Sequence, residues 1–177
     1  MTVGKHGLEY FFRQKRFLQV VSPKVFEILM VRLWNMDFGW REKERLADLN
    51  PSPNIYQGKD SMLSQIKKSR LCVYDYLATP WLETLSMNFP TVVFWDPERI
   101  KILNSALPFL DGLRSVNILH DTPESAAKLI NEIYGDPFTW WKSPERQQAR
   151  DKFCYHFART SENWLKEWKE ELSKMVR

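Results

Sequence analysis

The sequence contains few of the residues from which common metal and cofactor sites are built. Only two cysteines, Cys72 and Cys154, occur in 177 residues, and neither belongs to a CxxC pair. The three histidines show no zinc-ligand spacing, and there is no Asp-x-Asp pair. These absences exclude a disulfide framework, predict no bound metal and no cofactor, and favour a reduced, cytoplasmic setting.

Motifs of several ligand-binding and catalytic classes are missing as well. The chain has no GxGxxG, no P-loop, no GxSxG and no HExxH. No apolar run approaches the roughly 20 residues that span a bilayer, so we expect a protein that is not integral to a membrane. The net charge of +4 comes from 26 basic and 22 acidic residues that are interleaved along the chain. Nucleic acid is therefore not an expected partner.

What the chain does contain is an alternation of apolar strands and helices. We expect strands over residues 28–33, 70–74, 91–95 and 115–119, the third buried on both faces, and helices over residues 8–20, 60–68, 81–88, 96–110 and from 123 onward. Residues 34–54 are expected to form a loop, a short exposed helix and a turn. This pattern predicts one Rossmann-like α/β domain over residues 1–177, a parallel sheet flanked by helices, with residues 136–177 as a helical tail.

Helix boundaries follow from capping residues. A polar N-cap is expected at the start of four helices, and the residues that supply it are Asp60, Thr79, Thr122 and Ser161. Pro80 and Pro123 then take the first helical position in two of them. These boundaries place one helix N-terminus directly after the strand over residues 70–74.

That strand, loop and helix form the segment best suited to chemistry. Ligands of an open parallel sheet bind at the carboxyl ends of its strands. The first turn of the helix that follows this strand offers free backbone N–H groups, which can bind a diphosphate. Glu83 lies one turn into the helix, one residue too late to close a capping box with Thr79. Its carboxylate can therefore accept hydrogen bonds from two ribose hydroxyls. The alternative is an ordinary acid in a first turn, favoured by the helix dipole.

Other candidate ligand-binding residues can equally be explained by a purely structural role. Arg32 interrupts an apolar strand near its carboxyl end, where it either binds a phosphate or marks the strand end. Trp40 and Trp95 can stack on a base, or belong to the core. His120 precedes Asp121, which could orient the imidazole as a base, or the pair is a strand end followed by a turn.

Five segments of the chain resemble one known family. They cover residues 32–40 (RLWNMDFGW), 78–91 (ATPWLETLSMNFPT), 94–97 (FWDP), 118–127 (ILHDTPESAA) and 163–169 (NWLKEWK). The family consists of transferases from bacterial O-antigen and other surface-carbohydrate gene clusters. Its members are longer, and this chain resembles their C-terminal part, which is similar to the donor-binding half of GT-B glycosyltransferases.

The resemblance implies a nucleotide-sugar donor as ligand. Its binding residues would be Arg32 at the phosphates, the loop and helix residues Ala78, Thr79 and Thr84, and Glu83 at the ribose. GT-B enzymes generally need no bound metal. The acceptor site would lie in an N-terminal domain or a partner chain, so catalytic residues stay unassigned and activity of this chain alone stays open. Ala78 and Pro80 depart from the family loop, which often carries adjacent hydroxyl residues, and Pro80 removes one N–H donor.

A different class of function is the alternative. The last helix places several apolar side chains on one face, namely Trp164, Leu165, Trp168, Leu172 and Met175. Together with Trp140 and Trp141, this face could dock on a partner domain or on the inner membrane surface, or pair two copies into a homodimer. The chain would then be a non-catalytic interaction module.

Overall fold

A computed structural model describes residues 5–34 and 39–175 of the chain. The first half contains α1 (Lys5–Val20), α2 (Pro23–Ile28), β1 (Met30–Val31), α3 (Glu42–Ala47), β2 (Asn54–Ile55), α4 (Met62–Lys68) and β3 (Cys72–Tyr74). The second half contains α5 (Thr79–Ser86), β4 (Thr91–Phe94), the 3-10 turn η1 (Asn104–Ala106), α6 (Leu107–Ser115), β5 (Leu119–His120), α7 (Pro123–Ile133), α8 (Pro137–Trp141), α9 (Pro144–Phe157) and α10 (Trp164–Met175). The chain is an α/β protein.

Two short parallel sheets organise these elements. β1 pairs with β2, and β3, β4 and β5 form a second sheet with β4 in the centre. The parallel pairing confirms the expectation that helices connect the strands. One parallel sheet was predicted, whereas the strands form two sheets. The strands are also shorter than predicted, because each extends over only two to four residues.

The central strand β4 is buried on both faces, as predicted. Val92 and Phe94 point into one apolar cluster, where Phe94 stacks on Phe17 of α1 at a centroid distance of 5.2 Å. Val93 and the following Trp95 point into the other cluster. Alternate residues of a strand face opposite sides of a sheet, so β4 separates two layers of the core.

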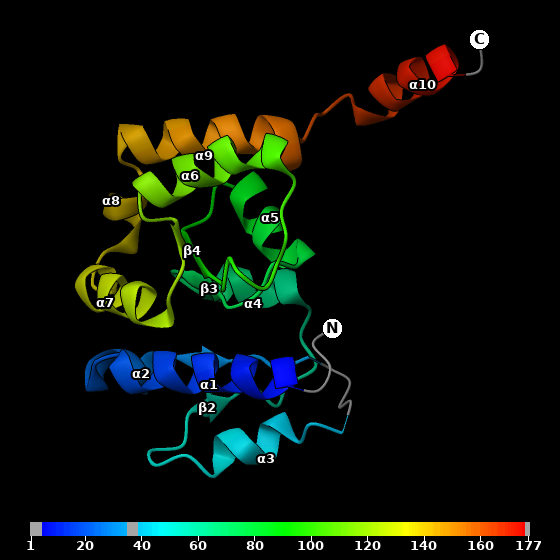
Figure 1. Ribbon diagram of the computed structural model, residues 1–177. Helices are drawn as coiled ribbons and strands as arrows, with labels where there is room; N and C mark the ends of the chain where they lie inside the picture. The colour runs from blue at the N-terminus through cyan, green and yellow to red at the C-terminus, as the bar shows by residue number, and fades with distance from the viewer. Residues whose placement is uncertain (1–4, 35–38, 176–177) are drawn as a thin grey trace.

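Helices cover both faces of this sheet (Figure 1). The first cluster receives buried side chains from α1, α2, α3 and α7, and the second receives them from α5, α6, α8 and α9. Trp141 of α8 and Phe153 of α9 are buried there, so most of the expected helical tail belongs to the core. Among the described elements, only α10 projects away from the others, and none of its residues is buried (Figure 1).

One predicted N-cap is confirmed and others are wrong. The Thr122 hydroxyl accepts from Ser125 N and caps α7, as predicted. Ser61 rather than Asp60 caps α4, because the Ser61 hydroxyl accepts from Ser64 N. Ser161 lies three residues before α10 begins, and its hydroxyl accepts from Asn163 N in the preceding turn.

The predicted helix over residues 96–110 is also wrong. α6 begins only at Leu107, because the Asp96 carboxylate accepts from Glu98 N and Arg99 and closes a local turn instead. The predicted strand over residues 115–119 starts too early, since α6 extends to Ser115. The strand predicted over residues 28–33 is reduced to β1. The short helix expected within residues 34–54 is α3, but β2, which begins at the last residue of that segment, was not predicted. Residues 35–38 lie outside the described part of the chain.

Candidate functional site

The carboxyl ends of β3, β4 and β5 lie on one edge of the sheet because the three strands are parallel. An aspartate follows each strand closely: Asp75 directly after β3, Asp96 two residues after β4, and Asp121 directly after β5. Open α/β sheets bind their ligands at this edge. A ligand-binding site is therefore expected at this edge.

Helix α1 lies across this edge and contacts all three aspartates. Gln14 Nε2 donates to Asp75 Oδ2 at 2.8 Å, and Arg13 Nη2 donates to the Asp121 carbonyl at 2.8 Å. Arg13 Nη1 lies 3.9 Å from Asp96 Oδ2. Contacts from a single helix to residues that follow three different strands fix α1 against the sheet edge.

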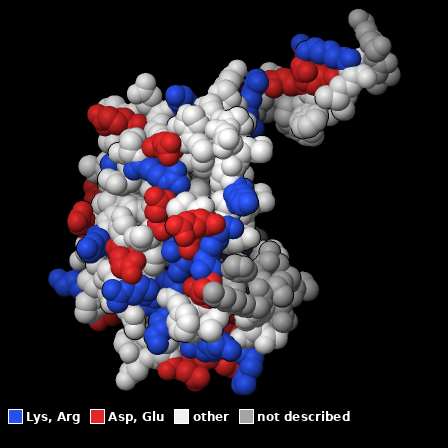
Figure 2. All heavy atoms as spheres, in the orientation of Figure 1, with Lys and Arg blue, Asp and Glu red and all other residues white. Residues whose placement is uncertain are grey.

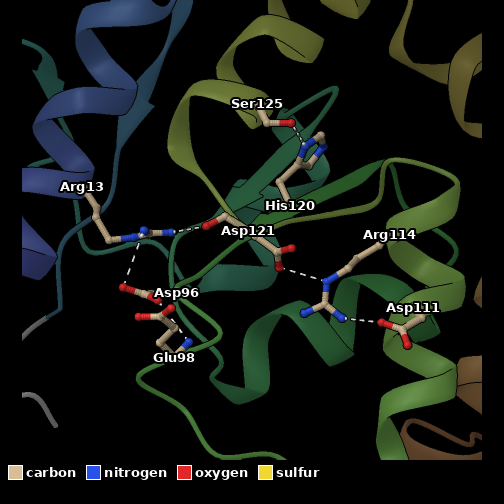
Figure 3. A network of polar contacts seen from close by, with 8 residues as sticks. All are labelled: Arg13, Asp96, Glu98, Asp111, Arg114, His120, Asp121 and Ser125. Carbon is tan, nitrogen blue, oxygen red and sulfur yellow. Dashed lines mark hydrogen bonds and ion pairs between the residues drawn. The ribbon is translucent and has the colours of Figure 1, made fainter.

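The charges of the edge form a paired network (Figure 3). Arg114 of α6 donates through Nε to Asp121 Oδ1 at 2.9 Å and through Nη1 to Asp111 Oδ1 at 2.8 Å. Arg13 and Arg114 reach Asp121 from opposite sides (Figure 3). Figure 2 likewise shows basic and acidic side chains interspersed over the visible face. The arginines of this edge are therefore balanced by neighbouring carboxylates.

Burial changes the protonation chemistry of two groups in this network. It raises the pKa of Asp75, while hydrogen bonds from Gln14 and Tyr10 oppose part of the rise. It lowers the pKa of Arg13, against the attraction of Asp96 and Glu124. Asp75 is thus a half-buried acid held by hydrogen bonds, with no cation bound to its carboxylate in the described structure.

The N-terminus of α5 forms the open part of the edge. The helix begins one residue earlier than predicted: Ala78 is the N-cap residue, with an extended backbone (φ −130°, ψ 167°), and Thr79 is already helical. Ala78 has no side-chain oxygen, so no side chain caps α5. Pro80 has no N–H, which leaves Thr79 and Trp81 to present the N–H donors of this turn.

The candidate residues of α5 differ in exposure. Ala78, Thr79 and Glu83 are exposed at the surface. Thr84 is fully buried, and its hydroxyl donates to the Trp81 carbonyl at 3.1 Å, so that hydroxyl is already used inside the helix. Tyr74, the last residue of β3, has a buried hydroxyl. Burial raises the pKa of Tyr74, and the neighbouring Cys72 adds to the rise.

Arg32 follows β1, in the other sheet. Its Nη1 donates to the Asp60 carbonyl at 3.1 Å, and its guanidinium lies 5.5 Å from the centre of the Tyr56 ring. These contacts come from the segment that follows β2, whereas α5 follows β3. The structure therefore places Arg32 at the carboxyl end of a strand in a different sheet from β3, without a described contact to α5.

The two tryptophans considered for base stacking are both packed. Trp40 is half-buried, and its ring covers Gly7 of α1. Trp95 is only 2% exposed, packs on Trp81 at a centroid distance of 6.2 Å, and leaves its Nε1 without a partner among the described residues. It borders a pocket of about 340 Å³ whose polar lining comes from Lys101, Asn104 and Arg114.

The histidine at this edge has different partners from those expected. Asp121 does not orient His120, because its carboxylate accepts from Arg114. The ring of His120 instead contacts Ser125 Oγ at 2.7 Å and the Asn117 carbonyl at 3.1 Å. In Figure 3 the ring points toward Ser125 and away from the Asp121 side chain.

Sequence reasoning missed the residues that α1 and α6 bring to the edge, above all Arg13, Gln14 and Arg114. The sequence does contain a signal for the partners of these residues, because an aspartate follows each of the three strands within two residues. Within the described ranges, no group of three or more His, Cys, Asp or Glu side chains could hold a metal ion. No helix of that part of the chain has the length and apolar character needed to cross a membrane.

Comparison with known proteins gives one match. The family model for the LIC12162 family transferases matches residues 1–172, which is nearly the whole chain. Searches of curated proteins and of solved structures found no match. A match of this extent shows the family: the chain belongs to the LIC12162 family of transferases.

Proposed function

We propose that this transferase-family chain is the donor-binding half of a glycosyltransferase, with a Rossmann-like domain of the GT-B type that holds a nucleotide sugar. The transferred sugar would enter bacterial surface polysaccharide such as O-antigen, and the acceptor would be held by an N-terminal domain or a partner chain. The observation that carries the proposal is the uncapped N-terminus of α5, beside the carboxyl end of β3 in a parallel sheet.

This helix end suits a diphosphate. The helix dipole and the free N–H groups of Thr79 and Trp81 favour an anion there. Because Ala78 supplies no capping oxygen, a phosphate oxygen meets no competitor from the chain at this turn. Pro80 limits the number of donors, so one phosphate group is expected to take most of the contact.

Glu83 suits the sugar of the nucleoside. Glu83 is exposed one turn into α5, where its two carboxylate oxygens can accept from neighbouring ribose hydroxyls. Arg32 stays in the proposal as a cation for the phosphates, reaching from the end of β1. Trp40 and Trp95 would need to leave their packed positions to stack on a base.

A thermal-shift screen tests the proposal. The purified chain is heated with UDP, GDP, CDP, CMP and dTDP, because a ligand of the folded state raises the melting temperature by mass action. We expect one nucleotide to raise it. Titration should then show that Glu83→Ala loses about 1–3 kcal/mol of binding free energy, the cost of removing a charged hydrogen-bond partner.

Glu145→Ala is the matched control, since Glu145 is likewise an exposed acid near the start of a helix, α9. It should bind the nucleotide as the unchanged chain does. Equal binding by the Glu83 variant would remove Glu83 from the site. The absence of a shift with every nucleotide would contradict donor binding by this chain alone.

A second candidate function rests on α10. Its apolar face is exposed, with Trp164 at 59%, Trp168 at 61% and Met175 at 79%, and the helix stands clear of the molecule (Figure 1). Exposed apolar faces of this kind mark interaction sites. The chain would then dock on a partner domain or pair with a second copy.

Sedimentation equilibrium of the unchanged chain and of Trp168→Ser tests this candidate. Self-association that is lost in Trp168→Ser and kept in Lys169→Ser, a change of a neighbouring exposed residue, supports the candidate. A monomer at high concentration in all three proteins would contradict pairing between copies.

A further inference from the structure

His120 and Ser125 form a pair that the donor site does not use. Ser125 is exposed in the first turn of α7, whereas His120, at the end of β5, is only 6% exposed. Ser125 Oγ lies 2.7 Å from His120 Nδ1, within hydrogen-bond distance (Figure 3). An accessible hydroxyl is thus held against a buried imidazole.

The second ring contact fixes where the protons are. His120 Nε2 lies 3.1 Å from the Asn117 carbonyl, and a carbonyl oxygen can only accept. Nε2 must therefore carry the ring proton, which leaves Nδ1 as an acceptor in the neutral ring. The Ser125 hydroxyl consequently donates to Nδ1, with the base oriented by a third group.

The surroundings keep this imidazole neutral. Burial lowers the pKa of His120, although the Asn117 carbonyl and the charge of Asp121 favour the protonated ring. The Asp121 carboxylate is bound by Arg114 of α6, and its carbonyl by Arg13 of α1. The Ser125 side of the ring faces α7, where the nearest charged residue in sequence, Glu124, pairs with Arg16.

We propose that Ser125 is an activated nucleophile with His120 as its general base, and that it accepts a phosphoryl group from a phosphoric anhydride. In the step, the bond between Ser125 Oγ and phosphorus forms, and the bond from phosphorus to the leaving oxygen breaks. The leaving group takes the bonding electrons, and the Ser125 proton moves to His120 Nδ1.

The position of Ser125 also suits the product. A phosphoserine in the first turn of α7 would be stabilised by the helix dipole. Arg16 of α1 lies close by, since its Nε is 2.8 Å from the carboxylate of Glu124, the residue before Ser125. His120 therefore offers a base for the reaction, and the helix dipole at the start of α7 favours the dianion that results.

Labelling with diisopropyl fluorophosphate tests the nucleophile directly. In this reaction fluoride leaves as the bond from Ser125 Oγ to phosphorus forms, and the modified residue is located by peptide mass spectrometry. We expect one labelled residue, Ser125, and no label in Ser125→Ala. Ser115→Ala is the matched control, because Ser115 is exposed but its hydroxyl only contacts the Gly112 carbonyl.

The role of His120 as general base is tested by the rate at which Ser125 is labelled. His120→Gln should slow labelling by about 10²–10⁴-fold, the usual contribution of a general base. Because His120 is buried, the pH dependence of the unchanged chain gives a second readout that needs no variant. The rate should fall only below pH about 6.5, the ordinary histidine value, since the pKa of His120 is lowered.

Two results would overturn the proposal: slow labelling spread over several serines, or a labelling rate that does not change with pH across the range where His120 titrates. Nucleotide binding at α5 is measured separately, and Ser125→Ala should leave it unchanged. Failure of this proposal is therefore distinguishable from failure of the donor site.

Discussion

Adding the missing cap to α5 should stabilise the protein and weaken donor binding at the same time. Ala78 already has the extended backbone of an N-cap residue but no oxygen to accept from the helix. In Ala78→Ser the hydroxyl can reach the N–H of Trp81, the third helical residue, because Pro80 at the second position has none. Ala78→Asp adds a negative charge at the positive end of the helix dipole.

The expected gain in stability comes from the polar cap and, in Ala78→Asp, from the added charge as well. A polar cap is worth about 0.5–2 kcal/mol over alanine, and the charge adds roughly 0.3–1 kcal/mol. For a chain of this length, each kcal/mol raises the melting temperature by about 2–4 °C. Both variants should therefore be more stable than the unchanged chain, and Ala78→Asp should be the more stable of the two.

Binding should change in the opposite order. The new side chain occupies a donor that the proposal assigns to phosphate, so Ala78→Ser should bind the nucleotide more weakly, and Ala78→Asp should bind it most weakly because like charges repel. Circular dichroism melts and a binding titration measure the two effects on the same samples. Stabilised variants that bind as tightly as the unchanged chain would refute phosphate binding at this turn. Unchanged stability would mean that these N–H groups already have partners.

Two further predictions concern the packing of α1. Burial raises the pKa of Asp75 above its value of about 3.9 in the unfolded chain. At pH values between the unfolded-state and the folded-state pKa, the folded protein therefore binds more protons than the unfolded chain. Its unfolding free energy should consequently fall as pH rises through that range. Urea unfolding between pH 3 and 7 should show that loss in the unchanged chain and not in Asp75→Asn; identical pH profiles would contradict it. Asn131 of α7 accepts from Ser22 N at 2.7 Å and donates to the Val20 carbonyl at 3.0 Å. Asn131→Ala should therefore cost about 1–3 kcal/mol in unfolding free energy, and a change of a few tenths would show that the two bonds are replaced by water.

The local sequence pattern predicted an element correctly where the conformational preferences of neighbouring residues alone determine its structure. The run of β-branched and aromatic residues over 91–95 predicted β4 and its burial on both faces. Thr122 followed by Pro123 predicted the start of α7. In both cases no distant residue competes with the local preference, so the sequence-based boundary agrees with the structure.

Local pattern failed where side chains far apart in the chain decide the geometry. The bond from Arg13 to the Asp121 carbonyl joins residues 108 positions apart. No local spacing predicts that contact, although the aspartates that end the three strands were visible. The short turn closed by Asp96 likewise overrode the helical pattern of residues 96–110, because a carboxylate that binds nearby backbone and arginine stabilises a turn at the expense of a helix.

The sheet edge therefore has two parts with different chemistry. On one side, α1 and α6 supply arginines that are paired with aspartates. On the other, α5 presents a helix end without a side-chain cap, and Glu83 is exposed one turn further along the helix. A ligand that brings negative charge gains more at the α5 side, because no carboxylate has to be displaced at its first turn.

The proposed donor site requires that a nucleoside diphosphate bind at the first turn of α5. Backbone amide chemical shifts of the ¹⁵N-labelled chain, titrated with the nucleotide that the thermal screen selects, locate this binding residue by residue. The largest shifts are expected at Thr79, Trp81 and Glu83, and they should saturate with the affinity measured by titration. Shifts centred on another part of the chain, with α5 unchanged, would contradict nucleotide binding at this helix.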